Sequence, residues 1–286
     1  MNINKIKTRI LYVVATPIGN IKDITYRAIH ILKTVQLIAA EDTRHTQNLL
    51  NHFNITTKMI SLHKYNEHKI TNKIIFLLNT KNIALVSNAG TPAIHDPGYI
   101  LIHACHKENI TVIPIPGPCA LIAALSASGL PGDNFYYKGF LPKTTLSRKK
   151  ILLHIQNIKE TIIFYESCHR ILYSIQDIVS YLGENRIIVL VKEITKIWER
   201  IKYGKAVDIL TWLKKDDLRQ KGEMVIIISG MNNHNNIIPI KVQRTLSILI
   251  KTLKMKQAIQ LTALIHKIHK NQIYNYAIKK FLHDKK

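Results

Sequence analysis

Two loops rich in glycine and proline are the segments of this 286-residue chain best suited to bind a ligand. One spans residues 88–98 and follows the apolar run 83–87, and the other, residues 116–120, opens a segment of small residues. Glycine and proline impose particular loop shapes, and small residues at a helix N-terminus leave space and free N–H groups for a ligand. Because ligands bind outside the carboxyl ends of strands in open α/β sheets, both loops are candidate binding loops.

A third candidate loop follows the first apolar run of the chain, at residues 15–20. Its Pro17-Ile-Gly19 turn lets backbone approach a ligand closely. The sequence contains neither G-x-G-x-x-G nor a glycine-rich P-loop. A nicotinamide-dependent dehydrogenase and a nucleotide hydrolase are therefore disfavoured.

Three groups of charged residues could take part in acid–base chemistry or bind phosphate. Carboxylates can accept a proton, and arginine or lysine can hold a phosphate group. Ion pairing between domains is the structural alternative for each group. The groups are Glu41, Asp42 and Arg44; Glu166 and Arg170; and Lys192, Glu193, Lys196 and Glu199.

Alternating strand and helix patterns predict the elements that position these groups. In the first half, apolar runs alternate with segments of helical spacing, which indicates a mostly parallel sheet covered on both faces. The second half is richer in strands that we expect to pair antiparallel. The expected strands are 10–15, 35–40, 83–87, 110–115, 135–139, 161–165, 186–193, 198–204 and 223–229; the expected helices are 25–34, 44–53, 98–107, 120–128, 147–156, 169–182 and 205–212.

The composition changes after the Asn-rich residues 231–236, and the pattern from residue 242 to residue 282 is helical throughout. We expect three short helices there, and residues 239–286 hold eleven basic residues against the single acid Asp284. The resulting domain prediction is an α/β domain over residues 1–117, a second α/β domain over residues 118–231 and a basic helical extension over residues 239–286.

The bulk composition favours a globular protein with a polyanionic partner. Hydrophobic residues make up 47% of the chain, and the net charge is +23. Such a charge attracts nucleic acid, although a bias toward lysine codons would also produce it. Three scattered cysteines and no H-E-x-x-H pattern give no metal site. The short apolar run near the start is neither a signal core nor a membrane span, so we expect a cytoplasmic protein without membrane association.

Several motifs, in their order along the chain, resemble those of the tetrapyrrole-methylase superfamily. They are Ala-Thr-Pro-Ile-Gly-Asn at 15–20, Ala-Glu-Asp-Thr-Arg at 40–44, the loop 87–98 and Pro-Gly-Pro-Cys-Ala at 116–120. Three further segments and the tail are similar to its ribosomal RNA branch, the 2′-O-ribose cytidine methyltransferase of the decoding region. These are Tyr-Glu-Ser-Cys-His-Arg at 165–170, Lys-Glu-Ile-Thr-Lys-Ile-Trp-Glu at 192–199, Lys-Gly-Glu at 221–223 and the tail residues 263–277.

The resemblance implies two α/β domains with a cleft between them that binds S-adenosyl-L-methionine, and a homodimer that acts on small-subunit ribosomal RNA. Glu41, Asp42, Arg44 and Glu166 are the catalytic candidates. The cofactor-binding candidates are Pro17, Gly19, Asn88, Ala89, Gly90, Thr91, Pro92, Ala93, Ile94, Asp96, Cys119, Ala120, Phe164, Tyr165 and Met224. For Phe164, Tyr165 and Met224, packing in the core of the second domain is an equal alternative.

The sequence departs from the family pattern at three positions. Asn88 stands where aspartate is usual, His95 where serine is usual, and Cys119 where serine is common. Asn88 keeps a carbonyl acceptor but could not fill a role that needs charge.

Two other functions stay open. The same fold could act on a porphyrin-like small molecule, or the chain could be a non-catalytic, ribosome-associated RNA-binding protein. The basic tail favours RNA over a porphyrin, and Asn88 alone favours loss of catalysis. We expect Trp198 and Trp212 to lie in the core rather than to stack on bases.

Overall fold

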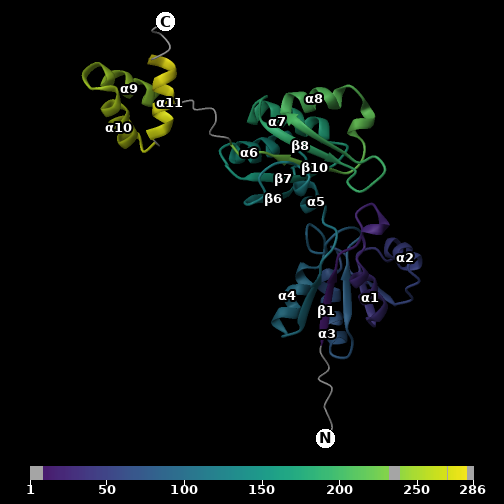
Figure 1. Ribbon diagram of the computed structural model, residues 1–286. Helices are drawn as coiled ribbons and strands as arrows, with labels where there is room; N and C mark the ends of the chain where they lie inside the picture. The colour runs from purple at the N-terminus through teal and green to yellow at the C-terminus, as the bar shows by residue number, and fades with distance from the viewer. Residues whose placement is uncertain (1–8, 232–238, 269, 282–286) are drawn as a thin grey trace. The chain divides into compact units, whose positions relative to one another are not determined.

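The computed structural model describes residues 9–231, 239–268 and 270–281. The chain divides into two compact units, Met1–Gly230 and Met231–Lys286 (Figure 1). The larger unit contains two five-stranded sheets, and the smaller one contains only helices in its described residues. No helix of the described chain is long and apolar enough to cross a membrane.

The first sheet is entirely parallel and has the strand order β3-β2-β4-β1-β5. Parallel strands buried on both faces are expected to be continuously apolar, and the Ile-Ala-Leu-Val sequence of β4 is buried at every residue. The strands are β1 (Ile10–Val14), β2 (Leu37–Ala40), β3 (Met59–Ser61), β4 (Ile83–Val86) and β5 (Thr111–Ile115).

Helices cover both faces of this sheet because successive strand residues point to opposite sides. Ala84 and Val86 pack with α1 and α2 on one face, whereas Ile83 and Leu85 pack with α3 and α4 on the other. The helices are α1 (Tyr26–Thr34), α2 (Thr43–His52), α3 (Glu67–Leu78) and α4 (Tyr99–Lys107), and a 3-10 turn, η1 (Ile21–Asp23), precedes α1.

The second sheet has the order β6-β7-β10-β8-β9. Only β6 and β7 are parallel, and the other pairs are antiparallel. The strands are β6 (Phe135–Phe140), β7 (Thr161–Glu166), β8 (Ile187–Lys192), β9 (Arg200–Lys205) and β10 (Met224–Ile228).

The two faces of the second sheet are covered unequally. Three helices pack on one face, namely α6 (Thr145–Ile155), α7 (Ile171–Leu182) and α8 (Ala206–Lys214), which is followed by the 3-10 turn η2 (Asp217–Gln220). The other face packs against the short helix α5 (Ala120–Ser126). Because α5 has only seven residues, part of this face is free to line a cavity.

The smaller unit has its own core. It consists of α9 (Ile240–Thr252), α10 (Met255–His266) and α11 (Lys270–Phe281). Val242, Leu246, Ile259 and Ile273 are buried among one another. The predicted three-helix extension is therefore present in the described residues.

The predicted fold class is confirmed, with β3 and α3 as additional elements that the pattern did not indicate. Each sheet lies wholly on one side of residue 117, although the domain boundary there stays a prediction. The prediction for Trp198 is wrong: β9 begins at Arg200, so Trp198 lies in the preceding turn and is 71% exposed. Trp212 packs against the core of the second sheet, as expected.

Glu67 connects the fold to the loop 88–98. Its buried carboxylate accepts hydrogen bonds of 2.9 Å from the backbone N–H groups of Gly98 and Ile100, at the start of α4. Unpaired N–H groups at a helix N-terminus need such an acceptor. The carboxylate therefore holds the end of the loop in place.

We expect Glu67→Ala to lower the free energy of unfolding by about 1–3 kcal/mol, because it leaves buried donors unpaired. Glu67→Gln keeps one acceptor oxygen and should cost less. Chemical denaturation measures both, with the exposed Glu184→Ala as a control that should stay within about 0.5 kcal/mol of the wild type. Equal stabilities for Glu67→Ala and Glu184→Ala would contradict the capping role.

Candidate functional site

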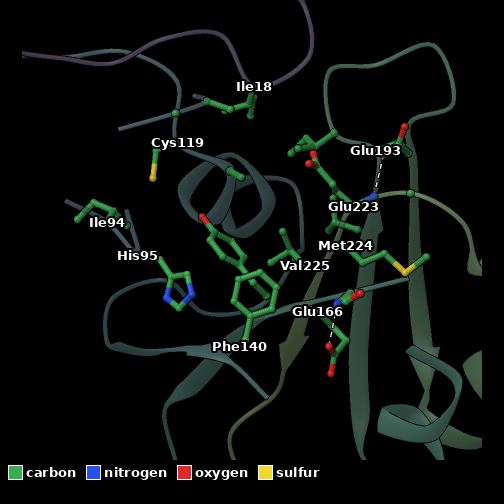
Figure 2. A pocket seen from close by; sticks show the side chains of 18 of the residues that line it. Ile18, Ile94, His95, Cys119, Phe140, Glu166, Glu193, Glu223, Met224 and Val225 are labelled. Carbon is green, nitrogen blue, oxygen red and sulfur yellow. Dashed lines mark hydrogen bonds between the residues drawn. The ribbon is translucent and has the colours of Figure 1, made fainter. Parts of the chain in front are cut away.

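A cavity of about 610 Å³ lies among loops of the first sheet and the α5 face of the second sheet (Figure 2). Its volume is within the range of about 300–1,000 Å³ typical of small-molecule sites. From the first sheet, the loop residues Ala89–Thr91 and Ile94–Asp96 line it, and Phe140, Tyr165 and Val225 line it from the second.

The three candidate loops are joined to one another by backbone contacts. Thr16 and Gly90 exchange two backbone hydrogen bonds of 2.9 and 3.0 Å, which join the loop after β1 to the loop after β4. The Thr91 hydroxyl donates to the carbonyl of Pro118 at 3.0 Å, which adds the loop after β5. The carboxyl ends of three neighbouring strands thus form one wall of the cavity.

The loop 88–98 has an unusual backbone. Gly90 has φ = +81°, and Ala93 and His95 have φ values of +65° and +71°. Positive φ is uncommon for residues other than glycine, so Ala93 and His95 are held there by the surrounding contacts. One result is that His95 lies 4.8 Å from Phe140 between ring centroids, at the cavity wall (Figure 2).

Asp96 is the carboxylate of the loop that lines the cavity. Burial raises the pKa of its carboxyl group to about 6, and the negative charge of Glu41 raises it further, against a hydrogen bond with Ser87 that lowers it. Burial also raises the pKa of Tyr165 to about 12. The Tyr165 hydroxyl accepts a hydrogen bond of 3.2 Å from the N–H of Leu121 in α5.

Four side chains in register across the second sheet form the apolar wall. Phe140 pairs with Tyr165, Tyr165 with Val225, and Val225 with Val191. Paired residues of neighbouring strands project to the same face, and all four line the cavity. This wall is suited to an aromatic or aliphatic part of a ligand.

A polar network lines another part of the cavity. The Lys196 ammonium lies 3.0 Å from both Glu193 and Glu223. Burial alone would lower the pKa of Lys196, but the hydrogen bonds to these carboxylates raise it above its usual value. Lys196 therefore stays charged, and the network joins the β8–β9 turn to the start of β10.

Most of the predicted cofactor contacts meet at this cavity. Phe164 lies instead on the helix-covered face of its strand and is wholly buried in the core, because side chains alternate along a strand. Pro17, Gly19, Asn88, Pro92 and Ala93 belong to the loops that form the wall but do not line the cavity. Those that line it are Ala89, Gly90, Thr91, Ile94, Asp96, Cys119, Ala120, Tyr165 and Met224.

The predicted catalytic residues lie in two places. Glu41, Asp42 and Arg44 follow β2 and do not line the cavity, whereas Glu166 does. The Glu166 carboxylate accepts hydrogen bonds from the N–H of Ser167, the guanidinium of Arg170 and the hydroxyl of Ser174. All three donors lie between residues 167 and 174, close to Glu166 in the chain.

Asn88 and Glu41 bridge neighbouring strand ends. The Glu41 carboxylate accepts from the N–H of Asn88 at 3.1 Å, and the Asn88 side-chain carbonyl accepts from the N–H of Asp42 at 3.2 Å. The side-chain carbonyl of Asn88 thus bonds backbone rather than facing the cavity. A hydrogen bond from the Arg44 side chain lowers the pKa of Asp42 to about 2, and Arg44 itself is 90% exposed.

Sequence reasoning missed a second set of cavity residues. The charged motif at 192–199 pointed to Glu193 and Lys196 as candidates for chemistry but not for this cavity. Most of the others lie in loops or motifs that the sequence analysis noted without assigning them to a ligand, whereas Phe140, Val191 and Val225 depend on strand register, for which the sequence has no signal. The others are Ile18, His95, Phe140, Ser167, Cys168, Val191, Ile194, Gly222, Glu223 and Val225. No group of three or more metal-ligating side chains is present in the described residues.

A family model and two similar proteins all point to methyltransferases. Residues 10–210 match the family model of tetrapyrrole (corrin/porphyrin) methylases. The chain is 55% identical over 282 residues to ribosomal RNA small subunit methyltransferase I of Buchnera aphidicola subsp. Baizongia pistaciae, covering 97% of this chain and 96% of that one. It is 49% identical to the protein of the same name from Escherichia coli O157:H7, covering 94% of each chain.

Solved structures with low identity share the fold. A diphthine synthase has a TM-score of 0.59 at 13% identity and covers 77% of this chain and 90% of its own. A cobalt precorrin-4 methyltransferase of cobalamin biosynthesis has a TM-score of 0.56 at 15% identity and covers 78% of this chain and 95% of its own.

The raised pKa of Asp96 predicts a pH dependence of stability. A carboxyl group whose pKa is higher in the folded than in the unfolded state stabilises the fold at low pH. That contribution is lost as the pH rises from about 4, the unfolded pKa, to about 6. We expect Asp96→Asn to remove this component and Glu41→Gln to reduce it. Urea denaturation between these pH values measures it, with Glu184→Gln as an unaffected control; identical pH profiles for Asp96→Asn and wild type would contradict it.

Proposed function

Because the chain belongs to the tetrapyrrole methylase family, in its ribosomal RNA small-subunit methyltransferase branch, we propose that it methylates a cytidine of small-subunit ribosomal RNA. The methyl donor is S-adenosylmethionine, and the acceptor is the ribose 2′-hydroxyl of a cytidine in the decoding region. The observation that favours RNA is the share of this chain that each group of similar proteins matches. The relatives named for ribosomal RNA match 94–97% of this chain, whereas the low-identity structures match 77–78%.

The cavity residues fit such a donor. S-adenosylmethionine combines an apolar aromatic base, a cationic sulfonium and an amino-acid group. The Asp96 carboxylate suits a cation, and the wall of Phe140, Tyr165 and Val225 suits an apolar part. The glycine loop brings the backbone of Ala89–Thr91 to the ligand, and the start of α5 at Cys119 and Ala120 adds a second backbone surface.

The donor supplies an activated methyl group, and the protein must place the acceptor oxygen in line with it and help remove its proton. An efficient proton acceptor has a pKa near the working pH. Asp42, whose pKa is about 2, is poorly matched to that task, and the Glu166 carboxylate already has three donors. We therefore propose Glu41, Asp42 and Arg44 as an RNA-positioning turn, with exposed Arg44 toward phosphate.

Asn88 does not favour a non-catalytic protein. Its side-chain carbonyl bridges to the N–H of Asp42 and it does not line the cavity. The departure from the usual aspartate therefore does not fall on a residue that lines the cavity. No observation specifically supports action on a porphyrin-like molecule. The solved structures that share the fold do so at 13–15% identity, which supports a shared fold but not a shared substrate. The homodimer and the cytoplasmic location stay predictions.

Gly90→Val tests the binding site. Gly90 has φ = +81°, and a Cβ atom there would lie 3.3 Å from Ile18. The variant should fold with a loss of about 1–3 kcal/mol from backbone strain and should weaken S-adenosylmethionine binding at least about tenfold, or 1.4 kcal/mol. Gly183→Val is the matched control, since Gly183 has φ = +96° and no neighbour within 4 Å of the added atom. Calorimetric titration of S-adenosylmethionine into both folded variants measures the affinity. Normal affinity in Gly90→Val would contradict the assignment of this loop to the binding site.

A substrate with one 2′-deoxy sugar tests the acceptor atom. If the 2′-oxygen accepts the methyl group, RNA with deoxycytidine at the modified position should gain no methyl group yet still bind, because most contacts to nucleic acid go to phosphate and other groups. Methyl incorporation is measured by mass spectrometry. The matched control has the deoxy sugar one nucleotide away and should be methylated. Transfer to the deoxycytidine substrate at the normal rate would refute the ribose assignment.

A further inference from the structure

The turn between β8 and β9 is anchored on several sides. Within it, Lys196 donates its N–H to the carbonyl of Glu193 and Glu199 donates to that of Lys196, at 2.9 and 3.1 Å. The Thr195 hydroxyl accepts from the N–H of Asn20 at 3.1 Å, which ties the turn to the loop after β1. Glu193 donates its N–H to the carbonyl of Glu223 at 2.9 Å. The backbone of the turn is therefore anchored to the loop after β1 and to the residue before β10.

This anchored turn presents two large apolar side chains to solvent. Ile197 is 92% exposed and Trp198 is 71% exposed. Tryptophan is highly buried on average in folded proteins, and no aromatic or cation–π contact in the described chain involves Trp198. An exposed indole on an anchored backbone is suited to bind a partner, because little backbone entropy is lost on binding.

The apolar surface continues along the edge strand β9. Ile201 pairs with Val191 and Tyr203 with Val189, so both side chains project from the face of the sheet that lines the cavity. Ile201 is 41% exposed and Tyr203 is 56% exposed. The row Phe140, Tyr165, Val225 and Val191 thus extends beyond the cavity to Ile201 at the sheet edge.

Positive charge accompanies these apolar residues. Arg200, Lys202 and Lys205 are exposed, and within the described residues they have no side-chain hydrogen bond or ion pair. Glu199 is the one acid of residues 197–205. Ile201, Tyr203 and Lys205 project from the cavity face of the edge strand, whereas Arg200 and Lys202 pair with Lys192 and Leu190 and project from its other face. We define the Trp198 surface as Ile197, Trp198 and both faces of this exposed edge, which adds Arg200, Ile201, Lys202, Tyr203 and Lys205.

The charge of this surface distinguishes between two candidate partners, a second copy of this chain and single-stranded RNA. In a symmetric contact between two copies, residue i of each copy meets residue j of the other, so a surface with three cations and one acid would face a surface of the same composition. Such a contact would leave most of these cations without an acid to pair with. Single-stranded RNA supplies both missing partners, because its bases stack on aromatic side chains and its phosphates bind cations. The net charge of +23 favours the same polyanion.

We propose that the Trp198 surface binds single-stranded RNA next to the nucleotide whose ribose enters the cavity, with a base stacked on Trp198 and phosphates held by Arg200, Lys202 and Lys205. Lys196 lines the cavity, and two residues of chain place Trp198 within about 7 Å of it, Cα to Cα. The distance suits a nucleotide that flanks the target. This inference rests on the proposed function and names a binding surface for its substrate.

Trp198→Ala should weaken RNA binding by about 5- to 150-fold, the loss expected for one base–aromatic stack. The probe is an oligoribonucleotide with the sequence around the modified cytidine, and its fluorescence anisotropy is measured with the full chain. Trp198→Phe retains a stacking ring and should restore most of the affinity. Tyr173→Ala is the matched control, because Tyr173 is 62% exposed on α7, a helix of the opposite face.

Two further measurements separate this surface from the active site. S-adenosylmethionine affinity should be unchanged in Trp198→Ala, and with unmodified small ribosomal subunits the variant should have a higher KM. Lys202→Ala should reduce the salt dependence of oligoribonucleotide binding by about 0.7 in log–log slope, the value for one phosphate contact on a single strand.

The outcomes are distinguishable. If the wild type transfers methyl groups but Trp198→Ala binds RNA as tightly as Tyr173→Ala, the Trp198 surface is not an RNA site. If Trp198→Ala instead dissociates a wild-type dimer in sedimentation while RNA affinity per protomer stays constant, a second copy occupies the surface, and the proposal is overturned. Absence of methyl transfer by the wild type would refute the proposed function, whereas the binding measurements would still test the surface.

Discussion

Two backbone hydrogen bonds between Thr16 and Gly90 hold the candidate site together. They join the loops that follow β1 and β4, and they require Gly90 to adopt a positive φ that a branched residue resists. The contact of Thr91 with Pro118 then adds the loop after β5. Once these three loops are joined, the glycine and proline residues form one continuous surface, and Asp96 lies at the cavity with Glu41 near enough to raise its pKa.

The opposite wall depends on a different constraint, the register of the second sheet. One row of paired residues places Phe140, Tyr165, Val225 and Val191 at the cavity. A shift of one residue in any strand would turn its member of this row toward the helices on the other face. The same register extends the row to Ile201 on the edge strand, so that a surface for a larger partner is continuous with the wall of the small-molecule cavity.

Charge has different roles in the parts of this protein. Near the cavity, Lys196 is neutralised by Glu193 and Glu223 and joins two segments of chain. On β9, Arg200 and Lys202 are exposed without an ion pair in the described residues. The first arrangement stabilises the site, whereas the second leaves cations available to phosphate. Net charge alone therefore favours a class of partner, and local pairing favours β9 as the place where the proposed partner binds.

The sequence by itself determined the alternation of strands and helices, the helical tail and the three glycine- and proline-containing loops at the strand ends, because these depend on local backbone preferences and on apolar periodicity. It also contained the family motifs. Only the tertiary structure decided that Phe164 faces the core while Tyr165 faces the cavity, that Asn88 bridges to Asp42, and that Trp198 is exposed. Each of these depends on which distant segments pair and in what register, and long-range packing sets that pairing.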